Sequence, residues 1–192
     1  SDMPSIIRGD DDFDTAEAFG GRVLLATLTA STSASLEFTA TDATKYMGYE
    51  FVCSRLLPAT SGGVMMVRTS TDGGSTYDSG GSDYSWHNLY GTAGSVTREV
   101  SSNDTYVRIT AAALDALTNP DGAYDGTFTC YAPDVSDWTR LVGTYGYYNS
   151  QGESSGLFQG VRKSTTAIDA FQVKNSSGNI TSGNIYVYGM VK

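Results

Sequence analysis

The sequence comprises 192 residues, with 12 Lys and Arg against 21 Asp and Glu, a formal net charge of −9 and an isoelectric point near 4.4. This balance argues against partners held mainly through phosphate groups, both nucleic acids and anionic membranes, because such binding needs clustered Lys and Arg. No apolar run approaches the roughly 18 to 20 residues that a transmembrane helix needs, and the N-terminus lacks the basic start and apolar core of a signal peptide. We therefore expect a soluble protein without an export signal.

An N-terminal arm is predicted over residues 1–21. The first two residues precede Met3 and look like the remnant of an expression tag, which makes Met3 the expected natural start. The segment Ser5–Asp14, SIIRGDDDFD, gathers four Asp around one Phe. Such an acidic cluster is typical of a solvated arm. The alternative is an attachment arm that becomes ordered when it binds another protein.

Residues 22–192 are predicted to form one antiparallel β-sandwich domain. Short runs rich in β-branched and aromatic residues alternate with links of Gly, Ser, Thr, Asn and Asp, which is the pattern of strands joined by turns. The links leave no room for βαβ units, so the sheets are expected to be antiparallel. We favour a jelly-roll-like sandwich over a barrel. The predicted strands are 22–30, 35–41, 46–56, 64–70, 84–90, 104–112, 126–132, 139–148, 156–163, 167–174 and 184–192, with a short helical turn near 112–117.

The two cysteines, Cys53 and Cys130, lie in separate predicted strands. Buried free thiols are the favoured interpretation, since a protein made in a reducing cytosol keeps its cysteines reduced, and a disulfide is the alternative. The chain has one histidine, and no Cys or His spacing is typical of a zinc site. We expect no metal and no cofactor.

A tight turn is predicted at Asp72-Gly73-Gly74, because glycine supplies the left-handed backbone and the Asp side chain can bond to nearby backbone groups. Asp72 and Asp78 could alternatively offer oxygen ligands to Ca²⁺. The EF-hand spacing is absent and two carboxylates make a poor site, so the turn is the favoured interpretation.

An aromatic group follows this turn and is the candidate ligand-binding site. Tyr and Trp rings can stack on the apolar faces of sugars while carboxylates and amides bond to sugar hydroxyls, and the same residues are common at protein interfaces. Strand alternation predicts that one face carries Tyr84, Trp86 and Asn88 and the other Ser85 and His87. Packing of Trp86 in the core is the alternative. The candidate ligand-binding residues are Tyr77, Asp78, Tyr84, Trp86, Asn88 and Tyr90.

The last predicted strand is apolar on both faces. Its alternation places Ile185, Val187, Gly189 and Val191 on one face, and Tyr186, Tyr188 and Met190 on the other. One face is expected to pack in the core. Because the second face is not polar either, it is predicted to be a subunit interface in a homo-oligomer.

No pattern of residues indicates an enzyme. No pair of carboxylates stands out as a glycosidase acid and nucleophile, and His87, the single imidazole, has no accompanying Gly-x-Ser-x-Gly turn or catalytic cysteine context. We expect a protein without catalytic residues.

The order of several segments resembles that of small virion proteins of tailed bacteriophages, of the tail-fibre or surface-fibre type. The segments are SIIRGDDDFD at the start, VMMVRTSTDGGSTYDSGG in the middle, GTFTCYAP before an aromatic strand, and IDAFQVKNSSGNITSGNIYVYGMVK at the end. The resemblance covers most of the chain after Arg22, and it carries over no catalytic residue. It implies a β-sandwich on the phage particle, assembled in the host cytoplasm and commonly a homotrimer, without the long repetitive shaft of a whole tail fibre.

Three functions follow from this resemblance. The first is a receptor-binding or adhesion module that binds host-surface glycans, with the arm attached to other virion proteins. The second is a purely structural virion component, such as a head decoration or fibre-assembly protein, in which the same aromatic residues are packed. The third and least favoured is a glycan depolymerase.

Overall fold

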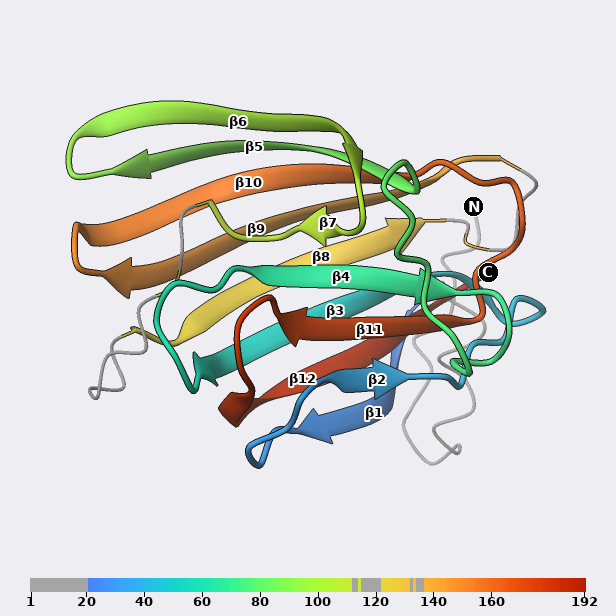
Figure 1. Ribbon diagram of the computed structural model, residues 1–192. Helices are drawn as coiled ribbons and strands as arrows, with labels where there is room; N and C mark the ends of the chain where they lie inside the picture. The colour runs from blue at the N-terminus through green and yellow to red at the C-terminus, as the bar shows by residue number, and fades with distance from the viewer. Residues whose placement is uncertain (1–20, 112–113, 115–121, 132, 134–136) are drawn as a thin grey trace, which may run out of the picture.

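The computed structural model describes residues 21–111, 114, 122–131, 133 and 137–192. These residues form twelve strands in two antiparallel sheets that pack face to face, and none of them belongs to an α-helix (Figure 1). The predicted β-sandwich is therefore confirmed. The predicted N-terminal arm lies outside the described residues apart from Gly21, and so does the predicted helical turn apart from Leu114.

The larger sheet has eight strands in the order β1-β12-β3-β8-β9-β10-β5-β6, and the smaller has four in the order β2-β11-β4-β7. The strands are β1 Arg22–Thr29, β2 Leu36–Phe38, β3 Tyr46–Pro58, β4 Met65–Ser70, β5 Tyr84–Thr92, β6 Ser95–Asp104, β7 Val107–Arg108, β8 Tyr124–Tyr131, β9 Thr139–Asn149, β10 Gly152–Arg162, β11 Ala170–Asn175 and β12 Ile180–Val191.

The strand order is that of a jelly roll with two inserted hairpins. Without β5–β6 and β9–β10, the remaining eight strands in chain order pair as first-eighth-third-sixth in one sheet and second-seventh-fourth-fifth in the other. This is the double Greek key arrangement of a jelly roll. The two inserted hairpins lie side by side and extend one sheet from four strands to eight (Figure 1). The extension doubles the width of that sheet.

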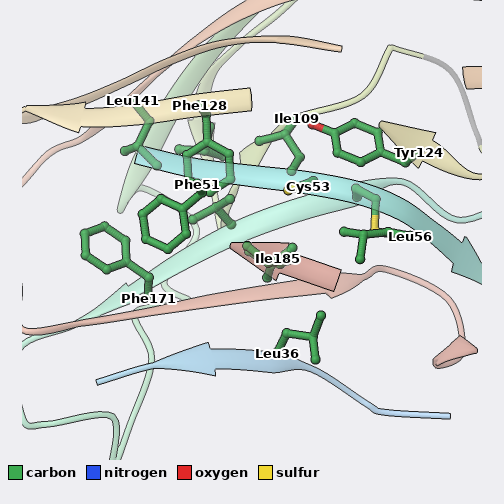
Figure 2. Close-up of a cluster of buried hydrophobic side chains, with 14 of the residues drawn as sticks. Leu36, Phe51, Cys53, Leu56, Ile109, Tyr124, Phe128, Leu141, Phe171 and Ile185 are labelled. Carbon is green, nitrogen blue, oxygen red and sulfur yellow. The ribbon is translucent and has the colours of Figure 1, made fainter. Parts of the chain in front are cut away.

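Aromatic side chains fill the space between the two sheets. Phe51 stacks on Phe128 with ring centroids 4.5 Å apart, and Phe171 from the smaller sheet approaches Phe51 at 5.0 Å (Figure 2). Both cysteines are buried free thiols, as expected. Their strands β3 and β8 pair so that Cys53 faces Gly126 rather than Cys130. Burial raises the pKa of both thiols.

One strand escaped the sequence analysis. Residues 95–104, SVTREVSSND, form the edge strand β6, although Arg, Glu and Ser interrupt their apolar residues. The strand is stabilised by pairing with β5. The two strands are joined by a hairpin turn at Ala93 and Gly94, both of which have the positive φ that such turns require. The strand predicted over 104–112 shrinks to the two residues of β7.

None of the segments that the structure describes is a helix able to cross a membrane.

Candidate functional site

The residues predicted to bind a ligand lie mostly in the core. Strand alternation in β5 is confirmed, but Tyr84, Trp86 and Asn88 point toward the smaller sheet, where they are 0%, 6% and 1% exposed. Their rings and amide are therefore unavailable for stacking on a sugar. The expectation of an exposed ligand face is corrected for these three residues, and the alternative of packing holds. Only sequence alternation was informative here, and it cannot say which face of a strand is buried.

A partly buried polar network connects these residues to neighbouring strands instead. The Trp86 indole nitrogen donates to Asp104 at 2.8 Å, and the Arg108 guanidinium lies 5.5 Å from the indole ring centroid. Asn88 donates from its amide to the Arg108 carbonyl at 3.2 Å. Arg108 in turn pairs with Glu99 at 2.8 Å. The network joins β7 of the smaller sheet to the inserted hairpin β5–β6.

The other three candidate residues are also engaged within the protein. The Asp78 carboxylate accepts a hydrogen bond from the Arg162 Nε at 2.6 Å, and its backbone amide donates to the Thr69 carbonyl at 2.9 Å. The Tyr90 hydroxyl is 3.2 Å from Glu99. Burial raises the pKa of Tyr77 to about 12. The two Asp78 bonds hold the link between β4 and β5 in place, and the Tyr90 contact joins β5 to β6.

The carboxylate of Asp72 organises the predicted turn. It accepts hydrogen bonds from the Thr76 hydroxyl at 2.6 Å, the Thr76 backbone amide at 2.9 Å and the Ser70 hydroxyl at 2.8 Å. These bonds favour the charged form and lower its pKa to about 2. Among the described residues, no group of three His, Cys, Asp or Glu side chains could hold a metal ion.

Asp72 is expected to make stability depend on acidic pH. Its pKa is depressed from 3.8 to about 2 on folding, so its contribution is complete above about pH 4 and is lost as the pH falls toward 2. The melting temperature of the native protein should therefore exceed that of Asp72→Asn at pH 5, and the difference should shrink toward zero at pH 2. A constant difference across this range, measured by circular dichroism, would contradict the assignment.

The predicted interface residues lie on the opposite side of the larger sheet, which we call the outer face because it points away from the smaller sheet. Tyr186, Tyr188 and Met190 are partly exposed there, whereas the alternate residues Ile185 and Val187 are fully buried in the core. The alternation predicted for this strand is confirmed. Whether a second subunit covers the three residues remains a prediction.

The outer face collects most of the exposed large apolar side chains among the described residues. Strand register places eight of them there, from 45% to 78% exposed. Exposed apolar side chains gathered on one face are typical of an interaction surface. The eight are Leu24, Leu89, Val96, Val100, Tyr131, Val142, Tyr148 and Leu157.

The outer face has two different halves. The four jelly-roll strands β1, β12, β3 and β8 form the tyrosine half, with bulky side chains from Tyr131, Tyr186, Tyr188 and Met190. The four inserted strands β9, β10, β5 and β6 form the aliphatic half. This half contains a hollow of about 370 Å³, whose lining includes Leu89, Leu157, Val161, His87, Gln159 and Arg98.

Charges on the outer face balance, although the chain as a whole carries −9. The Arg22 side chain on β1 forms an ion pair with Glu50 on β3, across the intervening strand β12. Regular alternation places Arg22, Arg98, Arg140, Glu50, Asp125 and Glu153 on the outer face, so it carries no acidic excess. The acidic excess therefore lies elsewhere on the molecule. A partner would meet a nearly neutral, apolar surface.

Sequence analysis missed the aliphatic half of this face. The signal was present in β10, where Leu157, Gln159 and Val161 alternate with the buried Phe158. Two apolar faces on one strand were recognised at the C-terminal hairpin but not here, because glycine and serine dilute the pattern.

Comparisons of the chain with protein-family models, with curated protein sequences and with solved structures returned no match.

Proposed function

We propose that this protein is a non-enzymatic structural component of a bacteriophage particle, held in its assembly through the outer face of the eight-stranded sheet. The observation that carries the proposal is the concentration of exposed apolar side chains on that face, which is also nearly free of net charge. Such a surface fits lasting contact with another protein surface, since burying apolar area is the main driving force of association. The phage setting is supported by the order of the sequence segments.

Assembly is favoured over glycan binding because of where the aromatic residues lie. Of the six candidate glycan-binding residues, Tyr84, Trp86 and Asn88 are packed in the core. Within the described residues, most of the large apolar side chains that reach solvent gather on one broad sheet, with Trp138 as an exception in a loop. A broad, largely apolar surface suits contact with another protein better than contact with a sugar, whose hydroxyl groups need polar partners.

Incorporation into particles tests the proposal. We expect Leu157→Glu, placed in the phage genome, to yield particles that lack the protein, because a charge would have to be buried without a partner. Ser177→Glu is the matched control, since it adds the same charge on the exposed link between β11 and β12. Immunoblots of purified particles give the readout, with folding of both variants checked by circular dichroism. Normal incorporation of folded Leu157→Glu would refute the proposal.

A further inference from the structure

We infer that the partner of the outer face is a second copy of this chain, and that the two copies pack face to face about a two-fold axis parallel to the strands. This inference rests on the proposed function and names the partner of the same surface. Its basis is that bulky side chains gather in the tyrosine half, whereas the hollow of about 370 Å³ lies in the aliphatic half. A surface that carries both a projection and a matching depression can complement itself.

Strand register shows which side chains would meet. A two-fold axis that runs between β8 and β9, the middle strands of the sheet, places β12 over β5 of the other copy and β3 over β10. Residues that share a row across the sheet then face each other, and Tyr188 and His87 share a row through Glu50, Thr129, Val142 and Gln159. Tyr188 therefore lies over His87 of the second copy.

The neighbouring row gives an apolar match. Tyr186, Val52, Thr127, Thr144, Leu157 and Leu89 follow one another across the sheet. The same rotation brings Tyr186 over Leu89 and Val52 over Leu157. Both tyrosines thus enter the hollow of about 370 Å³, and by symmetry each copy fills the hollow of the other. Interface cores are stabilised when side chains fill such hollows at the packing density of protein interiors.

A third row adds a polar contact. Tyr131 and Arg140 are register partners on β8 and β9, on either side of the axis. The rotation places the ring of Tyr131 over Arg140 of the second copy. A guanidinium above an aromatic ring is a favourable contact, worth roughly 0.5 to 2 kcal/mol depending on burial.

Other symmetries leave the face unmatched. A two-fold axis perpendicular to the strands would set tyrosines against tyrosines and one hollow against the other. A three-fold ring joins two different patches that face different neighbours, whereas both halves here point the same way. We therefore infer a dimer in place of the trimer that the resemblance implies.

Size and charge agree with a pair of copies. The eight strands are 8 to 13 residues long, and at a spacing of about 4.8 Å they give a face of roughly 1,100 Å². A standard interface buries about 800 Å² per partner. Two chains of charge −9 repel each other, but the outer face has balanced charges, so this approach keeps the acidic surfaces apart.

Cysteine cross-linking tests the arrangement directly. Both native cysteines are buried, so chains with Tyr188→Cys and chains with His87→Cys each present one accessible thiol. Mixed together and treated with a bismaleimide linker about 10 Å long, close to the spacing of packed sheets, they should give a cross-linked heterodimer. Each variant alone should not cross-link, because five strand spacings of about 4.8 Å separate equivalent thiols. Tyr188→Cys mixed with Leu24→Cys should also give none.

Sedimentation equilibrium separates this inference from the proposed function. The native protein should be a dimer at micromolar concentration, and Leu157→Glu should raise the dissociation constant at least about a hundredfold, since each dimer contains the change twice. Ser177→Glu should leave the dimer unchanged. A native monomer or trimer, or cross-links within a single variant, would overturn the two-fold pair. If particles nevertheless exclude Leu157→Glu, the proposed function stands with a different partner.

Discussion

Replacing Trp86 by alanine is expected to lower the free energy of unfolding by about 3 to 5 kcal/mol, the usual range for truncating a buried tryptophan. The indole is 6% exposed, so the substitution leaves a cavity between the sheets. It also removes the hydrogen-bond donor to Asp104 and the ring beneath Arg108. Two polar groups then lose contacts that hold β7 to the inserted hairpin. Urea denaturation monitored by circular dichroism measures the change.

The second tryptophan of the chain provides the control. Trp138 is 49% exposed, so Trp138→Ala should change stability by less than about 1 kcal/mol. A loss below about 1 kcal/mol for Trp86→Ala as well would contradict its place in the core. Such a result would support the exposed ligand site that the sequence predicted at Trp86.

Replacing Arg162 by methionine should destabilise the protein by about 3 kcal/mol, at the low end for breaking a buried ion pair because Asp78 retains some contact with water. The Arg162 side chain is 4% exposed and that of Asp78 is 30% exposed. Arg162 also donates to the Thr166 carbonyl at 2.6 Å, so both acceptors lose their partner. The pair fastens β10 to the link between β4 and β5.

A double-mutant cycle tests whether Arg162 and Asp78 interact. Asp78→Asn removes the charge that Arg162→Met would leave uncompensated, so the double variant should be more stable than the sum of the two single losses predicts. Additive losses, measured by thermal and urea denaturation, would show that the two side chains do not interact. A coupling above about 1 kcal/mol is expected.

Local patterns in the sequence were sufficient for most strands and for the fold class. Alternation at β12 correctly separated the core residues Ile185 and Val187 from Tyr186 and Tyr188 on the other face. It could not decide which face of β5 is buried, because both faces mix apolar and polar residues, with Trp86 and Asn88 on one face and Leu89 and His87 on the other. Trp86 and Leu89 lie on opposite faces of that strand, and only the packing of β7 decides between them.

Strand order was beyond reach of the sequence. The inserted hairpins β5–β6 and β9–β10 are separated in the chain by β7 and β8, yet β5 and β10 pair along nine residues. Nothing local specifies such a pairing, which depends on contacts distant in sequence. The aliphatic half of the outer face is made by this pairing. The surface that we propose as functional could therefore be recognised only once the sheet was assembled.

The central claim is that the outer face is covered in the assembled particle, and oxidative footprinting tests it most directly. Intact particles and the isolated, monomeric Leu157→Glu protein would be exposed to hydroxyl radicals and analysed by mass spectrometry. We expect Tyr131, Tyr188 and Met190 to be protected in the particle, with the exposed Trp138, in the link between β8 and β9, providing the reference. Equal oxidation of Tyr131, Tyr188 and Met190 in both samples would contradict the account.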